Sequence, residues 1–88
     1  MGIEDPAMAA NDVNGLVNLV SEILRIPQTD VIDALDMEET GTWDSLSHMQ
    51  LIVAIESEYG VELSADDIVT MRSVGNIKNV LRSKGVAV

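Results

Sequence analysis

The sequence predicts an all-α fold, a small four-helix bundle with three principal helices and one short helix. Apolar residues make up 47% of the 88 residues and recur at steps of three and four, the period of a helix with one buried face. Aromatic residues make up only 2%, so the core must be aliphatic. Capping residues precede the periodic segments, and Gly or Pro follows them. We therefore expect one domain, residues 11–85, with a long loop between the first two helices.

Residues 1–10 are expected to be a disordered segment outside this domain. Residues 1–7 mix Gly, Pro and acidic side chains without a helical period, and Met8 would serve equally well as a native start. Residues 1–7 are therefore either native or a remnant of cloning.

The first helix is predicted from Asp12 to about Leu24. Asn11 or Asp12 can cap its start, and Pro27 stops it, because the residue before a proline is pushed away from the helical conformation. The apolar positions that define this helix are Val13, Leu16, Val17, Val20, Ile23 and Leu24.

Residues 25–43 form a long acidic loop. We expect Val31, Ile32 and Leu35 to pin it onto the bundle. The acidic residues of the loop lack the ligand spacing, central Gly and terminal Glu of a calcium-binding EF-hand, so no metal site is expected. These acidic residues are Asp30, Asp33, Asp36, Glu38 and Glu39.

The second helix is predicted from Ser45 to about Tyr59, with Asp44 as its N-cap and Gly60 as its left-handed stop. It carries two apolar stripes, which is more than the burial of one face requires. The stripe expected in the core is Leu51, Ile52, Ile55 and Tyr59. The stripe expected to be partly exposed, beside acidic Glu56, is Leu46, Met49 and Val53.

Two further helices complete the bundle. Ser64 caps a short helix that has Asp66 and Asp67 in its first turn and ends near Thr70. Ser73 caps the last helix, from Val74 to about Ser83, and Gly85 is its expected stop. The residues of the last helix expected to face inward are Ile77, Val80 and Leu81.

The chain is strongly acidic, with 15 acidic and five basic side chains and a formal net charge of -10. Nucleic acid and anionic membranes need basic residues to neutralise their phosphates, so the charge balance argues against both as partners and favours a basic protein surface. The chain has no cysteine, hence no disulfide framework, and no apolar run long enough to insert into a membrane. We expect a cytoplasmic monomer.

The segment Asp44-Ser45-Leu46 is the candidate functional site. Asp44 as N-cap would leave the Ser45 hydroxyl exposed on the first turn of the helix, close to the positive end of its dipole. An anionic group attached to that hydroxyl would be held there without strain.

The chain resembles the acyl carrier protein family in three segments, residues 43–51 (WDSLSHMQL), 56–63 (ESEYGVEL) and 73–75 (SVG). The resemblance covers nearly everything after Asn11. It implies that Ser45 is modified with 4′-phosphopantetheine, with Asp44 and Leu46 beside the attachment point. A separate magnesium-dependent phosphopantetheinyl transferase would supply this cofactor from coenzyme A, and the chain itself would not be an enzyme.

By the same resemblance, a partner-recognition surface is expected at Leu46, Met49, Val53, Glu56, Leu63 and Asp66. Its acidic residues would steer basic enzymes and its apolar residues would dock. The implied partners are an acyl-activating ligase, a ketosynthase or an acyltransferase. Some matched positions depart from the acidic pattern of fatty-acid synthase carriers, which favours a specialised carrier. These positions are Ser47, Gln50, Ser57 and Gly60, together with Trp43, where a small residue is expected.

The leading function is a carrier of acyl thioesters for fatty-acid, polyketide or related lipid biosynthesis. An aminoacyl or peptidyl carrier, including one for D-alanine, would use the same Ser45 chemistry. A third alternative is an unmodified acidic helical adaptor that binds a basic partner. Trp43 is expected to anchor the loop by packing, and His48 is expected to lie at the surface or pack against the loop rather than act as an acid or base.

Overall fold

The computed structural model describes residues 13–88. Its helices are α2 (Val13–Leu24), α3 (Ser45–Tyr59), α4 (Ala65–Thr70) and α5 (Val74–Ser83), with a short 3-10 helix, η1 (Gln28–Asp30), between α2 and α3. The predicted all-α fold is confirmed, since the described residues form three longer helices and one short helix and no strand. The predictions for residues 1–10 and for a cap at Asn11 or Asp12 lie outside the described residues.

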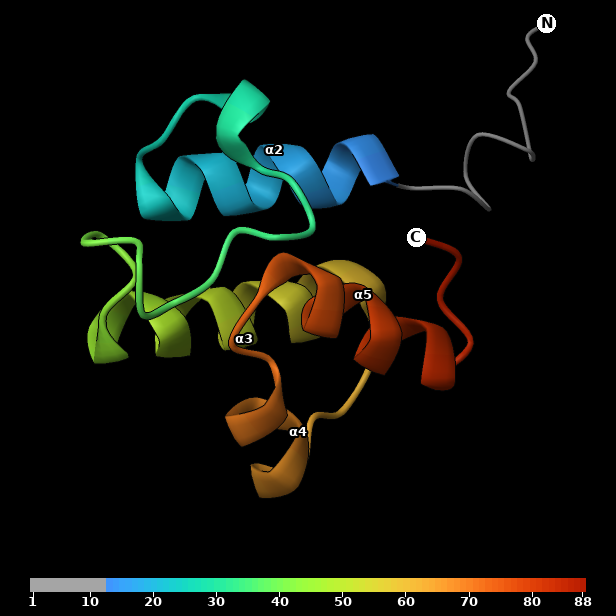
Figure 1. Cartoon of the computed structure of the whole chain (residues 1–88). Helices are drawn as coiled ribbons and strands as arrows, with labels where there is room; N and C mark the ends of the chain where they lie inside the picture. Colours follow the sequence, from blue (N-terminus) through green and yellow to red (C-terminus); the bar gives the residue numbers. More distant parts are fainter. Residues whose placement is uncertain (1–12) are drawn as a thin grey trace, which may run out of the picture.

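The helices are arranged around one core, which is mostly aliphatic, as expected, but also contains the ring of Trp43. Figure 1 shows α2 and α3 running in opposite directions, one above the other, with α4 on the side of α3 that faces away from α2. Buried residues of α2, α3 and α5 belong to a single cluster, whereas α4 contributes no fully buried residue. Among the four α-helices, α4 is therefore the one that contributes least to the core, through half-buried Ile68.

The helix boundaries follow the capping residues predicted from the sequence. Asp44, Ser64 and Ser73 are the N-caps of α3, α4 and α5, and each side chain accepts a hydrogen bond from the backbone N–H three residues later. Gly60 ends α3 in the left-handed conformation, with φ of 64°. Gly85 follows α5 with φ of 88°, as expected of a helix stop.

The end of α2 has a cause that the sequence did not indicate. The helix ends at Leu24 as predicted, but Arg25 already turns the chain in the left-handed region, with φ of 58°. The N–H of Ile26 then donates to the carbonyl of Ser21 at 3.1 Å, in the manner of a Schellman cap. Pro27 follows this turn and is the N-cap residue of η1, so it does not end α2 by itself.

The long loop is tied to the start of α5 by backbone hydrogen bonds. The N–H of Val74 donates to the carbonyl of Leu35 at 3.0 Å, and the N–H of Met37 donates to that of Arg72 at 2.8 Å. Val31 is buried and Leu35 is half-buried, as predicted. The prediction for Ile32 is wrong, because its side chain is 58% exposed. The backbone hydrogen bonds to Val74 and Arg72 hold the loop instead of that side chain.

The buried residues confirm the predicted inward faces, including Leu51, Ile52 and Ile55 of α3 and Ile77, Val80 and Leu81 of α5. Tyr59 packs against this core while remaining half-buried. His48 is the single buried polar side chain among the described residues. No helix within residues 13–88 is long and apolar enough to cross a bilayer.

Candidate functional site

Ser45 stands at the first position of α3 with its side chain exposed. The preceding residue, Asp44, is extended, with φ of -96° and ψ of -174°, and its carboxylate accepts the N–H of Ser47 at 2.8 Å. This hydrogen bond, which favours the charged form, holds the pKa of Asp44 below its ordinary range. The predicted N-cap is therefore confirmed, and it leaves the Ser45 hydroxyl at the positive end of a 15-residue helix.

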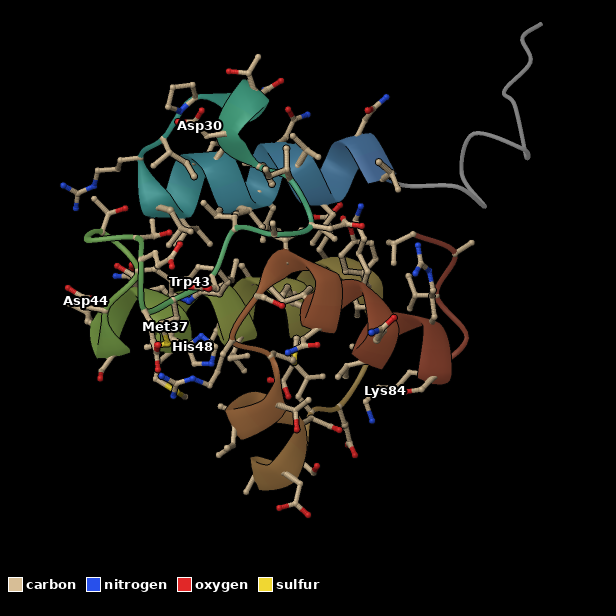
Figure 2. All side chains as sticks on the ribbon, in the orientation of Figure 1. Asp30, Met37, Trp43, Asp44, His48 and Lys84 are labelled. Atoms are coloured by element: carbon tan, nitrogen blue, oxygen red, sulfur yellow. The ribbon has the colours of Figure 1, made fainter. Side chains whose placement is uncertain are left out.

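The segment that enters α3 is anchored by Trp43. Its side chain is only 1% exposed, and its backbone N–H donates to the carbonyl of Thr40 at 2.9 Å. The indole Nε1–H donates to Nδ1 of His48 at 3.0 Å. Figure 2 shows Trp43 and His48 close together beneath the loop, while Asp44 lies at the outer end of α3. Trp43 is thus a packing anchor of the loop, as predicted.

His48 packs against the loop, one of the two environments that were expected for it, and not at the surface. Its side chain is 7% exposed, and Nε2 lies 2.9 Å from the carbonyl oxygen of Ile68. With Nδ1 bound to Trp43, both ring nitrogens are occupied by neighbours inside the fold. His48 therefore has no nitrogen available to take a proton from a serine hydroxyl.

A small hollow lies beside the start of α3. It is lined by Arg25 at the end of α2, by Gly41 and Thr42 of the loop, and by Asp44 and Ser47. The left-handed turn at Arg25 brings this basic residue to the edge of the site. An anionic group on Ser45 would be favoured by the helix dipole.

The stripe on α3 expected to be partly exposed is confirmed. Leu46 is 69% exposed, Met49 47% and Val53 61%. A shallow, largely apolar groove runs along the same side of the helix and is lined by Met49, Gln50, Val53, Ala54 and Ser57. An apolar surface left open next to a candidate attachment residue is typical of a protein-binding site.

One exposed apolar residue was missed from the sequence. Val69 of α4 is 67% exposed, whereas its neighbour Ile68 is half-buried against the core. In a helix of six residues, the apolar period is too short to tell which of two adjacent residues faces outward.

The remaining residues proposed for partner contact differ in their surroundings. Glu56 is half-buried, and its Oε2 accepts the backbone N–H of Leu63 at 2.9 Å. Leu63 is also half-buried and packs against the core. Asp66, in the first turn of α4, is exposed. Glu56 therefore holds the connection between α3 and α4, a structural role that the sequence did not indicate.

The carboxylates of the described region do not form an ion-binding cluster. Within residues 13–88, no group of three His, Cys, Asp or Glu side chains is placed to hold a metal ion. Asp36, for example, accepts the N–H of Glu39 at 2.9 Å, which closes a turn within the loop. The acidic loop residues are thus dispersed or engaged in local structure.

Comparison with known proteins gives one matching family model, described as the phosphopantetheine attachment site, over residues 14–81. Both Ser45 and the exposed stripe of α3 lie inside this range. The match covers most of the chain, and it spans all four described helices almost to the end of α5.

Curated relatives give the same result. The chain is 32% identical over 75 residues to polyketide-8 synthase acyl carrier protein 2 of Streptomyces avermitilis, covering 85% of this chain and 86% of that protein. It is 27% identical over 75 residues to an acyl carrier protein of Acidothermus cellulolyticus, covering 85% and 89%. It is also 30% identical over 71 residues to the meromycolate extension acyl carrier protein of Mycolicibacterium aurum, covering 74% and 67%.

Proposed function

The chain belongs to the acyl carrier protein family, and on this premise we propose that Ser45 is the residue to which 4′-phosphopantetheine is attached. Proteins of this family contain the phosphopantetheine attachment site and are carriers rather than catalysts. The bound cofactor supplies a terminal thiol that holds cargo as a thioester, in a chain that has no cysteine of its own.

The observation that carries the proposal is the setting of Ser45 among the seven serines, all of which lie in the described region. Four of them use their hydroxyls in hydrogen bonds within the fold: Ser21, Ser64, Ser73 and Ser83. Ser47 is half-buried and contributes to the hydrogen bonding of Asp44. The two exposed serines that remain are Ser45 and Ser57.

The helix dipole distinguishes these two residues. Ser45 is the first residue of α3, where unpaired N–H groups favour a negative charge. Ser57 lies in the last turn between Glu56 and Glu58, where both the helix dipole and the neighbouring charges disfavour a phosphodiester. The surroundings therefore fit a phosphate group on Ser45 better than on Ser57, with Asp44 and Leu46 flanking it.

The proposed cargo is an acyl intermediate of fatty-acid, polyketide or related lipid biosynthesis. This proposal is supported by the names of relatives, which include a polyketide synthase carrier and a meromycolate extension carrier. An aminoacyl or peptidyl carrier, including one for D-alanine, remains the alternative cargo class. The unmodified adaptor is no longer an alternative, because the family match makes the chain a carrier.

The proposed partners are a phosphopantetheinyl transferase and a ligase, ketosynthase or acyltransferase of the cytoplasm. We propose that they dock on the open stripe of α3, Leu46, Met49 and Val53, and on Leu63 and Asp66 around α4. Exposed apolar side chains support docking, and the net charge of -10 supports steering toward a basic surface. Glu56 would add charge at the edge of this surface.

The direct test is modification by a purified transferase with coenzyme A, followed by intact mass and peptide mapping. We expect a mass gain of one phosphopantetheine group, located on Ser45. Ser45→Ala should abolish the gain while changing the free energy of unfolding by less than about 0.5 kcal/mol, because the hydroxyl lies outside the core. The control is Ser47→Ala, which keeps the backbone N–H bound by Asp44 and should still gain the mass. Modification of Ser45→Ala would refute the assignment.

A further inference from the structure

Trp43 and His48 occupy two special positions at the start of α3. With Asp44 as N-cap, Trp43 is the residue before the cap and His48 is the fourth residue of the helix. A pair at these positions, called a hydrophobic staple when apolar, fixes the angle at which the chain enters a helix. Here the pair is joined by a hydrogen bond of 3.0 Å, with ring centroids 6.1 Å apart and planes tilted by 33°.

The chemistry of the two partners determines the proton position on His48. An indole N–H can only donate, so Nδ1 of His48 must be the acceptor. The carbonyl of Ile68 can only accept, so Nε2 must carry the proton and donate to it at 2.9 Å. Both bonds are made together only by the neutral ring with its proton on Nε2.

The bond to Ile68 matters because of where that carbonyl lies. Ile68 is in the last turn of α4, where carbonyls lack partners within the helix. The carbonyl of Asp67 accepts the N–H of Met71, and that of Thr70 accepts the N–H of Arg72. The carbonyl of Ile68 accepts instead from His48. A helix of six residues is too short to persist alone, so this external donor acts as its C-terminal cap.

We propose that His48 is a positioning residue that joins the segment entering α3, Trp43 to Ser45, to the end of α4. Through Nδ1 it fixes the direction in which Ser45 is presented, and through Nε2 it holds the last turn of α4, which carries exposed Val69. A change at either end of the Trp43–His48–Ile68 bridge is therefore transmitted to the other. The effect on Ser45 rests on its proposed role as the attachment residue.

Four variants separate the two bonds. His48→Phe removes both while retaining an aromatic ring, and Trp43→Phe removes only the donor to Nδ1. His48→Gln can still reach the Ile68 carbonyl, and His48→Asn can still accept from the indole. Val80→Ala is the control, because it weakens the core from α5 at a side chain that is 8% exposed and outside the bridge.

The first measurement uses the protein without cofactor. Amide hydrogen exchange should speed up by about tenfold at Met71 and Arg72 in His48→Phe, and by a smaller factor in Trp43→Phe, which keeps the bond to Ile68, beyond any change in α2. His48→Gln should restore much of the protection at α4. His48→Asn should instead preserve slow exchange of the indole N–H of Trp43, the single tryptophan. Val80→Ala should accelerate exchange generally, without selecting α4.

The second measurement is the rate of modification by the transferase. We expect kcat/KM to fall by about tenfold in folded His48→Phe, because a displaced Ser45 is a poorly oriented substrate. Selective loss of protection at α4 together with unchanged kinetics would overturn the positioning of Ser45. Exchange in His48→Phe and Trp43→Phe that matches the Val80→Ala pattern would overturn the bridge itself. If the wild-type protein gains no mass at all, the proposed function fails, while the exchange data still decide on the bridge.

Discussion

At the scale of single residues, the functional side chains are held by neighbours close in sequence. One carboxylate oxygen of Asp44 accepts the N–H of Ser47, and the lowered pKa of Asp44 keeps it ionised beside Ser45, the proposed attachment residue. Trp43 fixes the chain just before this cap. Ser45, the proposed attachment residue, is exposed at a helix end where the backbone favours an anion.

Glu56 has a structural role as well as the charge proposed for partner recognition, and two substitutions can separate them. Glu56→Gln keeps an oxygen that can accept the N–H of Leu63, so the melting midpoint should change little. Glu56→Ala leaves that half-buried N–H without its partner and should cost about 1 kcal/mol. Thermal unfolding of both variants measures this difference. If charge steers partners, both should slow association with a basic transferase, and the loss should shrink as salt is added. Equal rates for Glu56→Gln and the wild type would remove Glu56 from the recognition surface.

At the scale of secondary structure, α3 carries two apolar faces, one buried in the core and one exposed to solvent. Ile52 is 2% exposed and belongs to the core, whereas its neighbour Val53 is 61% exposed. One residue along a helix rotates the side chain by about 100°, which is enough to move it from the core to solvent. The helix is apolar on both faces, but only one of them is buried within the chain.

The open face should tolerate charge and the buried face should not. Met49→Glu and Val53→Glu should fold with midpoints near the wild type, because neither site requires a carboxylate to leave water. They should impair transferase or synthase kinetics. The matched control Ile52→Glu buries an unpaired charge and should unfold the domain, at a cost of several kcal/mol. Circular dichroism and modification rates distinguish these results. Unfolded Met49→Glu and Val53→Glu proteins would contradict the docking assignment.

The start of α4 depends on an ionised carboxylate. Asp67 accepts the N–H of Ser64 at 3.0 Å in a capping box, and Lys84 at the end of α5 lies 3.0 Å from the same oxygen. The hydrogen bond from Ser64 is the largest cause that lowers the pKa of Asp67 from its ordinary value of 3.8, and the hydrogen bond from Lys84 is the next. The lowered pKa means that the unfolded chain binds a proton more readily than the folded chain does.

The contribution of Asp67 to stability should therefore be lost in acid. It is fully present above pH 3.8 and disappears as the pH falls through the lower pKa of the folded state. Asp67→Asn should melt below the wild type at pH 7, and this difference should shrink as the pH falls below 3.8. Melting curves of both proteins across this range test the prediction. A difference that stays constant with pH would show that the charge of Asp67 does not matter.

At the scale of the whole molecule, few cations hold a strongly acidic chain together. Lys78 bridges to Asp33 of the loop at 2.7 Å, and Lys84 bridges to Asp67. Arg82 donates to the carbonyl of Val88 at 2.9 Å and so holds the C-terminal residue, which is 7% exposed, against the core. Three of the five basic side chains therefore hold separate segments together. Lys78 and Lys84 join segments far apart in the sequence, and Arg82 holds the C-terminal residue.

Salt should raise the melting midpoint. Repulsion within a net charge of -10 opposes folding, whereas surface ion pairs contribute only about 0–1 kcal/mol each, so screening should stabilise on balance. The melting midpoint in magnesium chloride should differ from that in sodium chloride only through diffuse binding of Mg²⁺ to the many carboxylates. Calorimetry at matched ionic strength measures both effects. An unresponsive midpoint would show that repulsion is not limiting, and a single tight stoichiometric site would contradict the absence of a metal cluster within residues 13–88.

The sequence by itself determined the helices and the exposure of Ser45, the proposed attachment residue. Asp44, Ser64, Ser73 and Gly60 act through hydrogen bonds and backbone angles within a few residues, so their effects can be predicted locally. The two faces of α3 could also be assigned, because its apolar residues recur at helical steps in two separate stripes over 15 residues.

Only the tertiary structure decided how the loop and α4 attach to the rest of the bundle. The exposure of Ile32, the bond of Glu56 to Leu63 and the bond of His48 to Ile68 all depend on residues brought together by folding. His48 and Ile68 are 20 residues apart, and neither a helical period nor a capping rule relates them. Such contacts arise from the packing of several elements at once, which is why the sequence predicts the candidate residue Ser45 and only the structure shows the contacts of the segment that precedes it.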